Sequence, residues 1–216
     1  MIVPLFLDTN DGRHFSKEAR QAIEEVCAGA EPEIRTHLED LPRSIELACQ
    51  TGTFVIPETG EMGMAVSPSR VGWTVNSNLP GGVPAIARAQ LRFTLFHELH
   101  HLARGWVMYG GAPRTSFMDG VVSEGLATVF ERDVGGRKTP WGDYPENVGN
   151  WVAELLELPV SAPYNRWMFD HPDGRRWIGY RAGAYIADQA IRASGLSAAE
   201  LALVPTDKVL KMSGAH

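Results

Sequence analysis

The chain has 216 residues, of which 44% are hydrophobic and 21% charged, a composition ordinary for one globular domain with a substantial core. The formal net charge of −6, without a cluster of Lys and Arg, argues against a nucleic-acid partner. No stretch approaches the roughly 20 apolar residues of a transmembrane helix, so no membrane partner is expected. Cys27 and Cys49 lie in apolar patterns typical of reduced core residues, and the apolar start of the chain is too short for a signal peptide, so we expect a cytoplasmic protein.

Residues 1–43 are expected to form an N-terminal helical segment. Residues 2–7 are predicted as a strand, which the proline at position 4 restricts to a sheet edge or an extended arm. Ser16 can cap a helix that runs to Ala28 and has an apolar inner face. Pro32 is expected to open a second turn or helix.

Residues 44–76 are predicted to form a small sheet, because apolar side chains alternate with polar or small ones from position 45 to 49. Further short strands, separated by turns that contain Gly or Pro, are predicted at residues 53–56, 64–66 and 71–75. The last of these has the clearest alternation and comes directly before a loop and the next helix. On sequence alone it fits an interior strand or an edge strand equally well.

Residues 84–105 are predicted to form one helix. Pro84 suits the first turn, no Gly or Pro follows until Gly105, and Gly105 supplies the stop. One stripe of this helix faces a core, since four leucines recur at the helical period: Leu91, Leu95, Leu99 and Leu102.

The second half of this helix carries an H-E-x-x-H motif. His97 and His101 are four residues apart and project from one face, and Glu98 follows the first of them. In this arrangement two imidazoles hold a divalent metal and the carboxylate stands beside a metal-bound water. The alternative is a buried helix whose histidines satisfy neighbouring backbone groups, but such burial is costly without a partner such as a metal. His100 points to the other side of the pair and is not expected to be a ligand.

A second helix is predicted from Ser116 to Gly135, with Ser116 and Asp119 resembling a capping arrangement. Glu124 falls inside it among apolar residues, where an unpaired carboxylate is costly. A zinc ion bound by two histidines needs a third protein ligand if one position is to stay open for water, and Glu124 can supply it. The alternative is a solvent-facing carboxylate beside a kink at Gly125.

The rest of the chain is predicted to be mainly helical. A helix is expected from Pro145 onward, followed by an irregular, aromatic-rich segment at residues 159–174. The next helix covers residues 180–194, and two glycines near its start would allow close approach to another helix. A capping box opens the last helix, and residues 208–216 are expected to fray, with His216 unsuited to ligate a metal.

The segments HELHH and SEGLATVFERDVGG together resemble a family of predicted zinc-dependent proteases that is described as a domain of unknown function. The similarity runs from about Ile45 to the C-terminal helix and includes the segment WIGY, residues 177–180. It implies an α+β, zincin-like metalloprotease fold, in which a small mixed or antiparallel sheet precedes the HExxH helix and residues 116–216 form a helical part. The whole chain, residues 1–216, is then expected to be a single zincin-like domain.

The resemblance implies a gluzincin-like peptidase with zinc bound by His97, His101 and Glu124 and with Glu98 as general base. Two histidines and one carboxylate would also accept manganese or cobalt, with zinc the usual occupant. Many gluzincins carry an Asp four residues after the ligand Glu to orient a ligand His, and this chain has Thr128 there. The orienting group must therefore come from elsewhere; Asp119 is our candidate.

The resemblance also implies substrate-binding groups. Tyr180, from its place in the WIGY segment, is expected to stabilise the developing oxyanion, with His171 and Arg181 as alternatives. In zincins a strand near the metal helix binds the extended substrate by edge pairing, and residues 71–75 are the candidate strand. The expected partner is a peptide or an unfolded protein. The alternative functions are a zinc-containing binding or regulatory module without turnover, and a zinc hydrolase of non-peptide amides.

Overall fold

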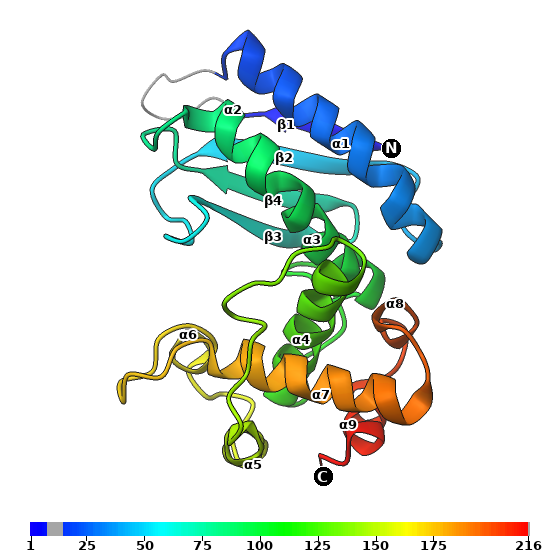
Figure 1. Ribbon diagram of the computed structural model, residues 1–216. Coiled ribbons are helices and arrows are strands. Elements are labelled where there is room, and N and C mark those ends of the chain that lie inside the picture. Colours follow the sequence, from blue (N-terminus) through cyan, green and yellow to red (C-terminus); the bar gives the residue numbers. More distant parts are fainter. Residues whose placement is uncertain (8–14, 216) are drawn as a thin grey trace. The chain divides into compact units, whose positions relative to one another are not determined.

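The computed structural model describes residues 1–7 and 15–215, and Figure 1 shows their helices and strands. The chain divides into two compact units, Met1–Gly111 and Ala112–His216, which are described separately below. The first unit combines helices with a four-stranded sheet, whereas helices dominate the second. The predicted α+β class is therefore confirmed. No helix in the described part of the chain combines the length and apolar character needed to cross a membrane.

The sheet is mixed and has the strand order β1-β2-β4-β3. Strand β2 pairs in parallel with both β1 and β4, whereas β3 runs antiparallel to β4. The strands are β1 (Ile2–Phe6), β2 (Ile45–Thr51), β3 (Glu61–Ser67) and β4 (Arg70–Val75). The predicted edge position of the first strand is confirmed. The strand predicted at residues 53–56 is wrong, because only Ile56 forms an isolated bridge before the chain turns back into β3.

Strand β4 is an interior strand, so its predicted role as a substrate-binding edge is wrong. It pairs with β2 through contacts such as Cys49 with Trp73, and with β3 on its other side. Its alternate side chains Val71, Trp73 and Val75 are fully buried. An edge strand with one buried face would show the same alternation, so the pattern reports the buried face and not the neighbours within the sheet. At the end of the sheet opposite β1, the edge strand is β3.

Helix α1 (Lys17–His37) begins as predicted, because the Ser16 hydroxyl accepts a hydrogen bond of 3.1 Å from the amide of Ala19. It does not end at Ala28. Pro32 lies inside the helix and does not open a new one. The loss of a hydrogen bond at the proline is tolerated because a buried stripe spans the position, including Cys27, Ala30 and Ile34.

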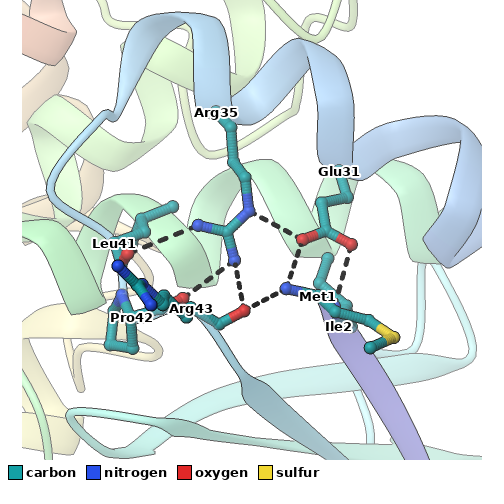
Figure 2. A network of polar contacts seen from close by, with 7 residues as sticks. All are labelled: Met1, Ile2, Glu31, Arg35, Leu41, Pro42 and Arg43. Carbon is teal, nitrogen blue, oxygen red and sulfur yellow. Dashed lines mark hydrogen bonds and ion pairs between the residues drawn. The ribbon is translucent and has the colours of Figure 1, made fainter.

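A polar network around Glu31 fastens α1 to the start of β1 (Figure 2). One carboxylate oxygen lies 2.7 Å from both the Arg35 guanidinium and the Met1 amino group, and the other accepts a 2.9 Å bond from the Ile2 amide. Arg35 also donates to the carbonyls of the chain that leads into β2, at Leu41, Pro42 and Arg43. Burial opposes ionisation, but these donors outweigh it and lower the pKa of Glu31 to about 2.

The predicted helix over residues 84–105 is present as a continuous run of three segments: α2 (Gly82–Ile86), a π-helical turn (Ala87–Leu91) and α3 (Arg92–Arg104). It ends at Gly105, whose φ of +71° is the left-handed cap that glycine favours. Helices α1 and α3 cover the same face of the sheet (Figure 1), with α1 against β1 and α3 against β3. The predicted stripe of four leucines is buried. The π-helical turn has no signal in the apolar pattern.

The second unit is organised by two crossing helices, α4 (Met118–Asp133) and α7 (Ile178–Ser194). A Cβ atom built on Gly125 would lie 2.1 Å from the carbonyl carbon of Gly183, so only glycines permit this approach. The close helix contact predicted from the glycines of α7 is thus confirmed, and α4 passes Gly125 without interruption. Shorter helices pack around the pair: α5 (Val148–Leu156), α6 (Tyr164–Met168), α8 (Ala198–Leu201) and α9 (Thr206–Ser213).

The C-terminal end of this unit differs in part from the prediction. The capping box of Ser197 and Glu200 forms and opens α8, as expected. The predicted fraying is wrong up to Ser213, because α9 buries Val209 completely and is a regular helix. His216 lies outside the described residues.

Candidate metal centre

The first unit supplies a pair of buried imidazoles. His97 and His101 lie one turn apart on α3 and are only 8% and 4% exposed. Their ring centroids are 4.7 Å apart with an interplanar angle of 83°, and a ligand nitrogen of one lies within 4.8 Å of a ligand nitrogen of the other. The predicted i, i+4 pair therefore converges as expected from a regular helix.

The carboxylate of Glu98 is also buried, and it lies against the edge strand of the sheet. A Cβ atom built on Gly63 of β3 would stand 2.6 Å from Oε1 of Glu98 and 2.5 Å from Cγ2 of Thr94. Thr94 lies one turn earlier on α3 and donates a 2.8 Å hydrogen bond to Glu61, which also accepts 2.9 Å from the indole of Trp73. The buried Glu61 thereby ties the start of β3 to both β4 and α3, at the level of Glu98.

The free edge of β3 is short. In an antiparallel ladder the N–H and C=O groups of alternate residues point away from the partner strand. At both ends of β3 the outward-pointing carbonyl groups are already bonded within the chain. The backbone carbonyl of Glu61 accepts a 3.0 Å hydrogen bond from the amide of Ile56, and that of Ala65 accepts a 2.9 Å bond from the amide of Met108. Between them, in the described residues, Gly63 presents its N–H and C=O outward, beside Glu98.

The second unit supplies a buried carboxylate. Glu124 lies in the middle of α4 and is 7% exposed. Its Oε1 accepts a 3.0 Å hydrogen bond from the hydroxyl of Tyr164, which belongs to α6. The predicted alternative of a solvent-facing carboxylate beside a helix kink is therefore wrong on both counts, since Glu124 is buried and α4 is unbroken.

The residues considered for oxyanion stabilisation all lie in the second unit. Tyr180 is half-buried in the first turn of α7, with its ring 5.6 Å from Trp177 and 6.0 Å from Phe169. The alternatives are engaged elsewhere: Arg181 donates to the carbonyl of Pro140 at 3.1 Å, and His171 lies 2.8 Å from a carboxylate oxygen of Asp173. The role of Tyr180 in oxyanion stabilisation therefore stays a prediction.

Asp119 has a structural role at the start of α4. Its Oδ2 accepts hydrogen bonds from the amides of Thr115 and Ser116, at 2.8 and 2.9 Å. Although burial opposes ionisation, these bonds and others from Thr115 and Thr206 side chains lower the pKa of Asp119. Its proposed role in orienting a ligand histidine stays a prediction. Thr128, at the position where many gluzincins carry Asp, is buried next to Gly142.

Sequence reasoning did not identify Glu61, Gly63 or Tyr164. Glu61 and Gly63 lie in a short segment that looks like an ordinary turn and strand, and their relation to α3 depends on sheet order. Tyr164 lies in the aromatic-rich segment that was predicted to be irregular, and it is 40 residues from its partner Glu124. The only available signal was that a long, aromatic-rich connection is often functional.

The residues that could hold a metal ion are all buried: His97 and His101 in the first unit and Glu124 in the second. The chain is thus an α+β protein with the donor chemistry of a metal-binding site. Residues 15–211 match the family described as Predicted Zn-dependent protease (DUF2268), and the chain belongs to this family. The resemblance inferred from the two motifs is confirmed. No curated protein matches the sequence, and no solved structure matches it.

Proposed function

We propose that the protein is a zinc-dependent peptidase of the gluzincin type, in which His97, His101 and Glu124 bind one zinc ion. The observation that carries the proposal is the pair of buried imidazoles on α3 with the buried carboxylate of Glu98 beside them. Membership of a family described as predicted Zn-dependent proteases supports the same conclusion.

The three donors fit zinc. Zinc favours imidazole nitrogen and carboxylate oxygen, and catalytic sites use three protein ligands and keep a fourth position open. Burying two histidines and two glutamates without a metal or other partners would be unfavourable. A purely structural zinc site would prefer a fourth protein ligand and would need no neighbouring base, so Glu98 favours catalysis over a module without turnover.

Zinc in such a site lowers the pKa of a water molecule toward neutrality and polarises a carbonyl group. Glu98 accepts the proton of that water as its oxygen bonds to the peptide carbonyl carbon. It then delivers the proton to the amine as the carbon–nitrogen bond breaks. Burial against Gly63 and Thr94 holds the Glu98 carboxylate in place for both transfers. Tyr180 is assigned to stabilise the negative charge on the carbonyl oxygen, as a hydroxyl donor on a rigid helix.

The substrate is a peptide or an unfolded protein segment, and it pairs with the edge of β3 at Gly63. This edge offers one outward N–H and one outward C=O, which recognise main chain and tolerate varied side chains. The positions on either side are occupied by Ile56 and Met108 of the chain itself. We therefore expect one substrate residue, and not a long strand, to pair with β3.

Zinc content tests the ligand assignment. Wild type is expected to bind one zinc per chain after dialysis against a weak chelator, measured by atomic emission. His97→Ala and Glu124→Ala are expected to lose it, whereas His37→Ala is expected to keep it because His37 is exposed at the end of α1. A wild type that takes up no metal would refute the proposal. If Glu124→Ala retained zinc, the assignment of Glu124 as the third ligand would be wrong.

A further inference from the structure

The hydroxyl of Tyr164, a residue of α6, reaches the carboxylate of Glu124 in α4. It donates a 3.0 Å hydrogen bond to Oε1 of the carboxylate, and the ring is half-buried while the carboxylate is 7% exposed. A carboxylate that accepts a bond on one oxygen has a defined plane, so its other oxygen is presented in a defined direction. Glu124 alone, at the end of two methylene groups, would sample several rotamers.

The Tyr164 ring is held at the start of α4. Its centroid lies 6.1 Å from the ring of Phe117, which is buried directly before α4. The guanidinium of Arg114 lies 5.6 Å from the centroid, within the range of a cation–π contact. These neighbours precede Glu124 on the same stretch of chain, so they place the ring next to the helix that carries the carboxylate.

Helix α6, which carries Tyr164, is fixed at its other end. Met168 is fully buried, and a Cβ atom built on Gly179 would lie 2.0 Å from its sulfur, so the thioether lies directly against the first turn of α7. The amide of Trp177 donates a 2.7 Å bond to the carbonyl of Phe169. Trp177 has a φ of +59°, a costly conformation for a bulky residue. Its buried ring packs on Phe169 and Tyr180.

We propose that Tyr164 is a positioning residue of the zinc site: its hydroxyl orients the Glu124 carboxylate for metal binding, and α6 holds it there. This inference rests on the proposed function. Groups that hydrogen-bond to a metal ligand typically contribute 10–100-fold to metal affinity. Tyr164 therefore couples the conformation of α6 and the following residues, up to Trp177, to zinc affinity.

The test compares Tyr164→Phe with Tyr144→Phe. Tyr144 is a matched control, because its hydroxyl also donates to a carboxylate of the second unit, Asp188, at 2.9 Å, but not to a proposed ligand. Zinc dissociation constants are measured by competition with a chromophoric chelator. We expect Tyr164→Phe to weaken zinc binding about 10–100-fold and Tyr144→Phe to leave it within about twofold. The visible spectrum of the cobalt-substituted protein should change in Tyr164→Phe alone.

A double-mutant comparison separates positioning from general damage. In a Glu124→Ala background the Tyr164→Phe change should cause no further loss of residual zinc affinity. Equal zinc affinity of Tyr164→Phe and wild type would overturn the inference while leaving the zinc site intact. Equal weakening by both tyrosine variants would overturn it too, since the effect would then be unspecific. Wild type without zinc would refute the proposed function, and the inference with it.

Discussion

Replacement of Gly125 by alanine tests whether the glycine of the EGLA segment is required by the helix crossing. The added Cβ atom would lie 2.1 Å from the carbonyl carbon and 2.2 Å from the carbonyl oxygen of Gly183. Carbon atoms in contact are normally about 3.5–4.0 Å apart. Because the clash is with backbone, no side-chain rotation relieves it, and α4 and α7 must separate by on the order of 1 Å.

The expected change in the free energy of unfolding of Gly125→Ala is the sum of two opposing effects. Overpacking a core costs about 1–3 kcal/mol, and a clash with backbone belongs at the upper end. Alanine is favoured over glycine within a helix by about 1 kcal/mol, which leaves a net destabilisation of about 2 kcal/mol. Gly149 in α5 provides the matched control, since a Cβ atom there would meet nothing within 4 Å. Gly149→Ala should therefore stabilise the protein by about 0.4–1 kcal/mol.

The assay is urea unfolding of the metal-free proteins, followed by far-UV circular dichroism. Chelator is present so that zinc binding does not contribute to the apparent stability. We expect Gly125→Ala and Gly149→Ala to change the free energy of unfolding in opposite directions. In thermal unfolding, Gly125→Ala should lower the midpoint by about 4–8 °C. If Gly125→Ala is as stable as Gly149→Ala, the crossing is not limited by backbone contact and the reasoning is wrong.

Three further predictions concern the first unit. Gly63→Ala places a methyl group 2.6 Å from Oε1 of Glu98. Peptide cleavage should therefore fall about 10–100-fold, while the zinc content stays unchanged. Undiminished cleavage would contradict the placement of Glu98 as the base. Glu31→Gln should lower the unfolding free energy by about 1.5–3 kcal/mol at neutral pH. Since the folded pKa is about 2 and the ordinary value 4.5, the deficit should be full above pH 4.5 and shrink as the pH falls toward 2; a deficit independent of pH would refute it. Burial raises the pKa of the Cys27 thiol to about 12 and also raises that of Cys49. Neither thiol should therefore react with a thiol reagent at pH 8 before the protein unfolds. Rapid labelling of the folded protein would contradict this prediction.

Local features of the chain were predictable because they depend on local geometry. The H-E-x-x-H helix, its apolar stripe and its glycine stop follow from helical periodicity and from glycine's access to positive φ. The convergence of His97 and His101 follows from i, i+4 spacing. The burial of Glu124 was predictable from its apolar neighbours. The capping groups Ser16 and Ser197 were predictable for the same local reason.

The features that were not predictable depend on contacts between distant segments. Strand β4 has the alternation of any strand with one buried face, and only the order of the sheet makes it interior and β3 the edge. Pro32 usually interrupts a helix, and it is tolerated here because packing on both sides of it outweighs the local cost. Tyr164 and Glu124 are 40 residues apart in the sequence, and the periodicity of apolar residues cannot predict a contact between such distant residues.

Cleavage of casein by wild type and Glu98→Gln, at equal zinc content, tests whether the protein is a zinc peptidase with Glu98 as its general base. The amide of glutamine is close in size to the carboxylate but cannot accept the proton of the attacking water. We expect both proteins to bind one zinc per chain, wild type to cleave casein, and Glu98→Gln to retain less than about 1% of that activity, in line with the 10²–10⁴-fold typical of general-base catalysis. Equal cleavage by the two proteins, or cleavage by neither across a broad peptide library, would contradict the assignment of a zinc peptidase with Glu98 as its base.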